Sequence, residues 1–234
     1  MAPLDGLRII REAFPRTIRL VTTARLRKSV LRPLVDDDRE LAALAELEGA
    51  TSARLIGQTH GTAGIDAKEF VHGVPHAAFI NASFAYAKPR ELNRFSGPNR
   101  GAWYAALHVE TALREVIFHM REFLDAAGDF NAIVDYAEML ASMAGEFVDL
   151  RGLDPSPPYL NPDKTIGYPA GNGLADRVRQ SGWNGIIYPS VRHGGGTCLV
   201  ALWPHAVQSV AQGDIHRVTW AGQPEPKVMK LASP

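Results

Sequence analysis

Residues 94–116, RFSGPNRGAWYAALHVETALREV, predict a turn, a short strand and most of a helix in direct succession. The turn formers SGPNRG at 96–101 interrupt regular structure. AWYAAL at 102–107 then predicts a strand. From 109 to 126 apolar residues recur at 3.6-residue spacing, which predicts an amphipathic helix with one buried stripe.

Three functional side chains are spread over this stretch, with Arg94 on the turn, Tyr104 on the strand and Glu115 on the helix. At 100° per residue, Glu115 lies about 60° outside the apolar arc of its helix. A carboxylate in that position is ordinarily a solvated surface residue, so a purely structural interpretation is available. Because the turn and the strand must pack beside the same helix, the three side chains also have a catalytic interpretation as the wall of one site.

A second informative block is GWNGIIYPSVRHGGGTCLVALW at 182–203. Its apolar runs at 185–188 and 199–203 predict two buried strands. Ser190 follows the first strand, where serine is commonly a turn or cap residue. The block has neither a G-x-S-x-G nucleophile elbow nor the lysine of a P-loop. Ser190 is therefore expected to act as a hydrogen-bonding residue at a strand end.

The remainder of the chain predicts strands and helices without a regular β-α-β order. The predictions are a strand at 17–21, helices at 36–48, around 135–147 and at 175–180, strand or irregular structure at 71–89, and a long loop at 151–173, which holds five prolines and four glycines. This mixture favours a single α+β domain over a doubly wound parallel sheet.

Composition excludes several classes of protein. Lys and Arg together number 25, as do Asp and Glu, so overall charge does not favour nucleic acid or an anionic membrane as partner. The only cysteine, Cys198, rules out an internal disulfide and fits a reducing compartment. No apolar run approaches about 18 residues, so we expect a cytoplasmic protein.

Metal binding is not predicted. His72 and His76 are four residues apart, but Pro75 intervenes and no H-E-x-x-H motif occurs. The basic residues between 19 and 32 alternate with leucines and are interpreted as a solvated or acid-pairing surface.

Taken together, R-F-x-G-P-x-R-G-x-W-Y…E-T-A-L-R-E-V and G-I-I-Y-P-S-V-R-x-G-G-G-T-C-L-V resemble the RES domain, the toxin of bacterial RES–Xre toxin–antitoxin pairs. The resemblance covers about residues 17–222 and is strongest in 94–116 and 182–203. It leaves 1–16 as an N-terminal leader and 223–234 as a loose C-terminal tail.

Two features depart from the commoner members of that family. The segment 17–93 is long, which leaves partner recognition open, and Cys198 stands where asparagine is frequent. We expect the cysteine to affect packing only.

The resemblance implies a fold related to ADP-ribosyltransferases and an activity that degrades NAD+ by splitting its nicotinamide–ribose bond. The family's arginine, tyrosine, glutamate and serine fall on Arg94, Tyr104, Glu115 and Ser190. In that chemistry Glu115 stabilises positive charge on the ribose. Arg94 binds the pyrophosphate or an attacking phosphate, and Ser190 orients the substrate.

Three further positions are expected to bind substrate. Tyr104 offers a face on which nicotinamide can stack. Arg192 is expected to be an additional anion contact, and Arg19, on the first strand, another. No cofactor is implied, since NAD+ is the substrate, and either water or inorganic phosphate is the acceptor.

Partners and rival functions also follow from the resemblance. It implies an Xre-family antitoxin as partner, with no direct contact to nucleic acid, and dimers are the default expectation for such proteins. The alternatives are an ADP-ribosyltransferase that modifies a protein acceptor and a non-catalytic binding module of the same fold.

Overall fold

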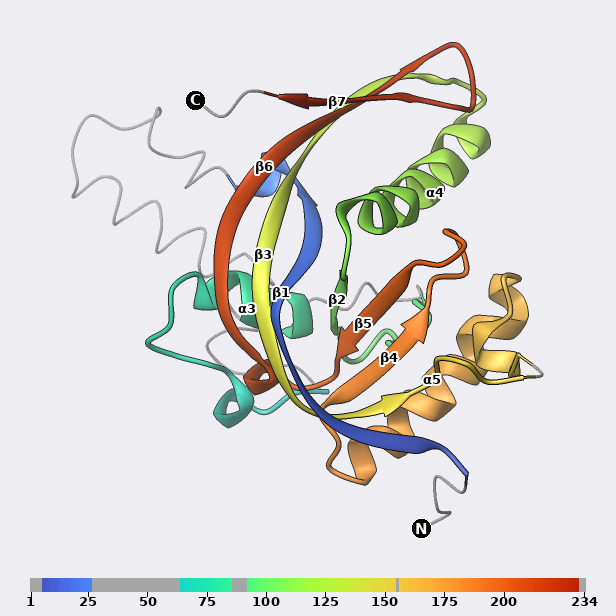
Figure 1. Ribbon diagram of the computed structural model, residues 1–234. Helices are drawn as coiled ribbons and strands as arrows, with labels where there is room; N and C mark the ends of the chain where they lie inside the picture. Colours follow the sequence, from blue (N-terminus) through green and yellow to red (C-terminus); the bar gives the residue numbers. More distant parts are fainter. Residues whose placement is uncertain (1–5, 27–63, 86–91, 155, 232–234) are drawn as a thin grey trace, which may run out of the picture.

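The computed structural model describes residues 6–26, 64–85, 92–154 and 156–231 (Figure 1). Within them, seven strands form one sheet: β1 (Arg8–Thr22), β2 (Trp103–Ala106), β3 (Asn131–Asp149), β4 (Gly185–Pro189), β5 (Thr197–Ala201), β6 (Val207–Ala221) and β7 (Lys227–Leu231). The α-helices of the described residues are α3 (Ala77–Ala85), α4 (Val109–Ala127) and α5 (Lys164–Gln180). The predicted single-domain α+β class is confirmed.

Strand pairing closes on itself. The order is β1-β2-β5-β4-β3-β6-β7, and β1 also pairs with β3, so β1, β2, β5, β4 and β3 form a ring. The pairing of β3 with β4 is parallel, and the other pairings are antiparallel. The long strand β3 runs beside β6 over most of its length, and its last residues, Phe147–Asp149, pair with β4. In Figure 1, β1, β3 and β6 curve together along one side of the molecule.

Alternating side chains divide the core between the two faces of the sheet. On one face, buried residues of the strands pack against α4 and α5, and Leu174 and Val178 of α5 are fully buried. On the other face the sheet packs against α3, where Ile80 and Phe84 are fully buried. Neighbours in β2 show the alternation, because Tyr104 belongs to the first cluster and Trp103 to the second.

Helix α5 packs closely on the segment that precedes β2. A Cβ atom on Gly171 would lie 2.0 Å from the carbonyl oxygen of Arg94, and one on Gly167 would lie 2.8 Å from Arg94 Nη1. Only glycine permits this approach, so two residues that weaken a helix by propensity are required here by packing. The helix begins after Asp163, whose side chain accepts a hydrogen bond from the Thr165 N–H at 2.8 Å.

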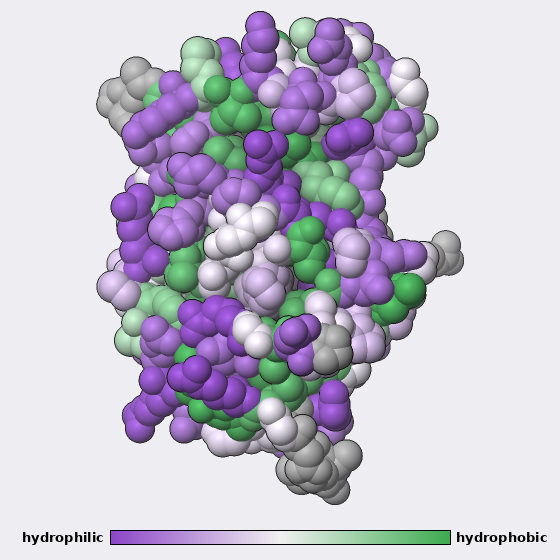
Figure 2. All heavy atoms as spheres, turned by 45° about the vertical axis from the view of Figure 1, so that its right-hand side comes forward, coloured by the Kyte–Doolittle hydropathy of each residue, from purple (hydrophilic) through white to green (hydrophobic). Residues whose placement is uncertain are grey.

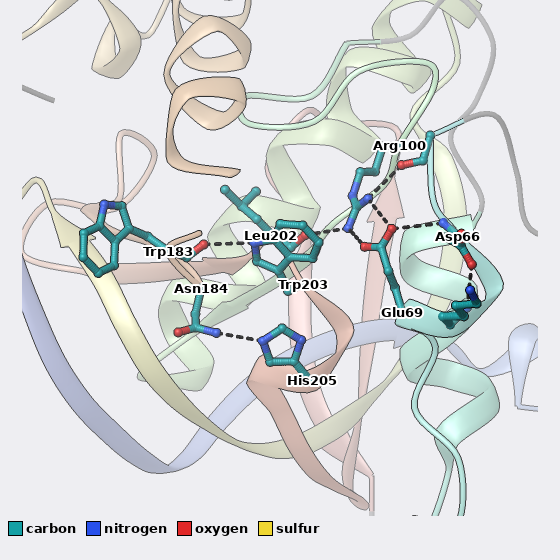
Figure 3. A network of polar contacts seen from close by, with 10 residues as sticks. Asp66, Glu69, Arg100, Trp183, Asn184, Leu202, Trp203 and His205 are labelled. Atoms are coloured by element: carbon teal, nitrogen blue, oxygen red, sulfur yellow. Dashed lines mark hydrogen bonds and ion pairs between the residues drawn. The ribbon is translucent and has the colours of Figure 1, made fainter. Parts of the chain in front are cut away.

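Arg100 joins three separate parts of the chain (Figure 3). Its Nη1 donates to the Gly64 carbonyl at 2.8 Å and to the Glu69 carboxylate at 3.2 Å. Its Nη2 donates to Glu69 and to the carbonyl of Leu202, and its guanidinium lies 4.7 Å from the ring centroid of Trp203. These contacts fix the turn before β2 to the segment before α3 and to the end of β5.

The side of the molecule that carries α4 and α5 faces the viewer in Figure 2. Hydrophobic residues there form small separate groups among hydrophilic ones. Among the described residues, no helix is long and apolar enough to span a membrane.

Several local predictions were wrong. Residues 135–147 lie in β3 and not in a helix, because β1 and β6 pair with both edges of this segment. Residues 77–85 form α3. The predicted loop at 151–173 contains the start of α5, which continues through the short helix predicted at 175–180.

The first and last strands described extend into segments that were predicted to lie outside the domain. β1 starts at Arg8, within the segment assigned as a leader, and includes the strand predicted at 17–21. The tail is not loose, because Lys227–Leu231 pairs with β6 as β7. The helix predicted at 36–48 lies outside the described residues.

The packing of α5 predicts opposite effects for one substitution made at two neighbouring glycines. Gly173→Ala should stabilise the protein by up to about 1 kcal/mol, since a Cβ at Gly173 meets no atom within 4 Å and alanine favours the helix. Gly171→Ala should destabilise it by about 1–3 kcal/mol through overpacking against Arg94. Chemical denaturation measures both, and equal stability of the two variants would contradict the packing described.

Candidate active site

A cavity of about 220 Å³ opens on the face of the sheet that carries α4 and α5. Its walls come from β1, β2, β4 and β5, from both helices, and from residues just before β2 and just after β4. Of the predicted site residues, Arg19, Arg94, Tyr104, Glu115 and Arg192 line it.

Ser190 donates a hydrogen bond to Glu115, which lines the cavity. Its Oγ lies 2.6 Å from Glu115 Oε1 and accepts the backbone N–H groups of Arg192, at 3.1 Å, and His193, at 3.0 Å. A hydroxyl has one proton. Because Ser190 Oγ accepts hydrogen bonds from both backbone N–H groups, its own proton is free to be donated to the Glu115 carboxylate. Ser190 thus holds Glu115 in one orientation, as expected for a hydrogen-bonding serine at the end of a strand.

Cys198 approaches the same carboxylate oxygen. Its Sγ lies 3.7 Å from Glu115 Oε1, and burial raises the pKa of the thiol, which keeps it protonated as a donor. The cysteine was expected to affect packing only, and the contact adds a polar function. Glu115 Oε1 therefore accepts hydrogen bonds from Ser190 and Cys198.

Arg94 is a buried cation, with 7 % of its surface exposed. Its Nη1 donates to the carbonyl oxygens of Tyr159, at 3.0 Å, and Asn161, at 2.9 Å. Its guanidinium lies 5.4 Å from the ring centroid of Tyr168 on α5. Arg94 thus joins the loop before α5, and α5 itself, to the segment before β2, in addition to lining the cavity. The sequence did not indicate this role.

Tyr104 is anchored by its hydroxyl to the turn that carries Arg94. The Phe95 N–H donates to Tyr104 Oη at 2.9 Å, and Ser96 Oγ lies 3.1 Å from the same atom. Burial raises the pKa of Tyr104 to about 12, so the phenol stays neutral. The ring is held against the cavity wall by its hydroxyl end.

Cationic side chains gather where α4 meets α5. Arg192 lies 3.5 Å from the ring centroid of Phe118 and donates from Nη2 to the Pro162 carbonyl at 2.8 Å. Lys164 lies 5.2 Å from the same ring and pairs with Glu122. This arrangement places positive charge next to the anionic Glu115 wall.

Arg19 lies on β1, as predicted, and its side chain packs away from α4 and α5. Its neighbours Ile18 and Leu20 face the cavity side of the sheet, so strand alternation directs the Arg19 side chain to the other face. Its guanidinium lies 4.9 Å from the ring centroid of Trp103. Arg19 also contributes to the cavity lining, and its Nη1 donates to the Tyr104 carbonyl at 3.5 Å. Its role as an anion contact stays a prediction.

Tyr168 and His119 are among the cavity-lining residues that the sequence reasoning did not assign to the site. Tyr168 lies on α5, within the stretch predicted as a loop. His119 follows Glu115 by one helical turn, and that spacing was the available signal. Partial burial and the nearby Lys164 cation lower the pKa of His119, so its neutral form prevails at neutral pH.

The residues described contain no group of three or more His, Cys, Asp or Glu side chains arranged to hold an ion.

The cavity lies within a single α+β domain, and its charged lining includes Arg94, Arg192 and Glu115. The RES domain family matches residues 70–221, about two thirds of the chain. The chain therefore belongs to the RES domain family, which is generally linked to NAD+-related toxin function. Comparison with curated proteins gave no match.

The anchoring of Tyr104 predicts a stability cost for Tyr104→Phe. Removing the hydroxyl leaves the Phe95 N–H without its acceptor, which should cost about 1–3 kcal/mol of unfolding free energy. Tyr159→Phe is the control, because its hydroxyl makes no hydrogen bond to the described residues, and its cost should be near zero. Similar losses in both variants, measured by urea denaturation, would contradict the anchoring role.

Proposed function

We propose that this protein cleaves the nicotinamide–ribose bond of NAD+ and transfers the ADP-ribose unit to phosphate or water. The main observation behind the proposal is that the Glu115 carboxylate lines the cavity and accepts a hydrogen bond from Ser190, with Oγ and Oε1 2.6 Å apart. The membership in the RES domain family supports the same substrate.

The chemistry requires a carboxylate of this kind. The bond between ribose C1′ and the nicotinamide nitrogen breaks, and its electron pair moves to the nitrogen, which becomes neutral. Positive charge develops on the ribose, and a fixed carboxylate stabilises it. An oxygen of phosphate or water then bonds to C1′, and in the case of water a proton is released.

The size of the cavity suggests which part of NAD+ it encloses. Its volume of about 220 Å³ is below the roughly 300–1,000 Å³ of sites that hold a drug-sized ligand. The nicotinamide riboside end would occupy it, with the base against the Tyr104 ring. The pyrophosphate would lie where Arg94, Arg192 and Lys164 supply positive charge.

Arg192 would have to exchange an existing contact to reach this anion. Its Nη2 donates to the Pro162 carbonyl, and its guanidinium stacks on Phe118. Because a charged phosphate is a better acceptor than a neutral carbonyl, substrate binding would favour the exchange.

Two broader expectations belong to the same proposal. The closed ring of strands with flanking helices would be a relative of the ADP-ribosyltransferase fold. A protein antitoxin of the Xre family would neutralise the activity by covering the mouth of the cavity.

Replacing Glu115 is the direct test. Glu115→Gln keeps the shape and removes the charge, so NAD+ cleavage by purified protein should fall by about 10²–10³-fold. Glu110→Gln is the matched control, since Glu110 is exposed in the first turn of the same helix, and it should retain full activity. Equal activity of Glu115→Gln and the wild type would remove Glu115 from the mechanism.

Product analysis separates the acceptors. Reactions with and without inorganic phosphate are resolved into ADP-ribose, ADP-ribose 1″-phosphate and protein-linked ADP-ribose. Cleavage that needs phosphate defines a phosphorylase, cleavage without it a hydrolase, and label on protein a transferase. No NAD+ loss from folded protein free of antitoxin would overturn the proposal in favour of a binding module.

A further inference from the structure

The segment between β4 and β5 is joined to α4 by two side-chain hydrogen bonds. One is the bond from Ser190 to Glu115, and the other joins His193 Nδ1 to Thr111 Oγ1 at 2.9 Å. Thr111 and Glu115 are four residues apart on α4, so they lie on the same face of the helix, one turn from each other. The two hydrogen bonds therefore join neighbouring turns of α4 to the same segment between β4 and β5.

The hydrogen bond between His193 and Thr111 is shielded from solvent on the Thr111 side. Thr111 is 0 % exposed, so its hydroxyl would lose its partner entirely if the His193 ring moved away. Leaving a buried hydroxyl unpaired is costly. The ring is thus held in place by the hydrogen-bonding requirement of the buried threonine.

A glycine makes room for this tie. A Cβ atom on Gly196 would lie 2.6 Å from Thr111 Oγ1 and 3.0 Å from His193 Nδ1. The Gly196 N–H also donates to the His193 carbonyl at 3.0 Å, and its carbonyl accepts the Ser190 N–H at 2.8 Å. The third glycine of the GGG run therefore closes the turn around the histidine. Its role is packing, which the sequence did not indicate.

We propose that His193 is a positioning residue, which holds Ser190 in the orientation that fixes the Glu115 carboxylate; this inference rests on the proposed NAD+ cleavage. The same residue acts at both ends of the turn. Its backbone N–H donates to Ser190 Oγ at 3.0 Å, and its ring is tied to Thr111. When the ring tie is lost, the backbone N–H shifts and the Ser190 proton is no longer directed at Glu115.

Two variants of His193 separate the hydrogen bond from the bulk of the side chain. His193→Asn places a polar atom at the position of Nδ1, whereas His193→Leu has the same branching without hydrogen-bonding capacity. For the leucine variant, kcat for NAD+ cleavage should fall by about tenfold, the order expected for one lost hydrogen bond. Its KM should change less than twofold, and the asparagine variant should stay within about threefold of wild-type kcat.

The partner residue supplies an independent test. Thr111→Val keeps the shape of the side chain and removes the hydroxyl, so it should lower kcat as His193→Leu does. The double variant should be no worse than either single variant, because both remove the same tie. If His193→Leu does not fold, as judged by thermal unfolding, the comparison of Thr111→Val with the wild type carries the test.

The outcomes distinguish this inference from the proposed function. An active wild type together with unchanged kcat in His193→Leu and Thr111→Val would overturn the positioning role alone. Equal losses in the asparagine and leucine variants would also overturn it, because the ring and not its hydrogen bond would then matter. A folded wild type that does not cleave NAD+ would overturn both proposals.

Discussion

Burial of the Arg94 guanidinium constrains everything that surrounds the cavity. A cation removed from water must find hydrogen-bond acceptors in the protein. Here the acceptors are the carbonyls of Tyr159 and Asn161. To bring them within reach, the chain after β3 must cross over the segment that precedes β2. Helix α5 then follows on top of Arg94, and its glycines allow the contact. One buried charge thereby holds the loop before α5, and α5 itself, against the segment that precedes β2.

Glu115 differs from Arg94 because other residues hold its side chain in place. Its carboxylate lies on a regular helix and is held by donors from two strand ends, Ser190 and Cys198. A carboxylate that accepts two hydrogen bonds in a fixed geometry has little freedom to reorganise. This is the property that stabilisation of a developing positive charge requires. The cavity thus combines Arg94, which holds two chain segments together, with Glu115, which is held in place by residues of other segments.

Sequence reasoning was reliable where local pattern and tertiary structure agree. The helix predicted at 109–126 and the strands at 102–107 and 185–188 match α4, β2 and β4, because their apolar periodicity is also their packing pattern. It failed at β3, where residues such as Ala137, Met139 and Ala141 favour a helix but pairing on both edges imposes a strand. It failed again at α5, because Pro169 and several glycines conceal a helix that tertiary contact sustains.

For the candidate site, the family pattern named Arg94, Tyr104, Glu115 and Ser190 before any geometry was known. The contacts of these residues could not be predicted, since Tyr159 and Asn161 lie more than sixty residues from Arg94. The direction of the Arg19 side chain could not be predicted either. A single residue on a predicted strand cannot be assigned to a face until the register with its neighbours is known.

The closed ring of strands also has a consequence for synthesis of the chain. Of the strands described, β1 is translated before the others, yet its register aligns Arg8 with Asp149, and its other partner is β2. Pairing strands that are far apart in sequence requires a long loop to close, which costs conformational entropy before stabilising contacts form. Folding is therefore slower than for local pairing. β4 and β5, which complete the ring, are translated later still. A chain that ends before β5 would lack the strand that pairs with both β2 and β4, and with it Cys198 of the cavity lining. Such an incomplete translation product would therefore carry no assembled cavity.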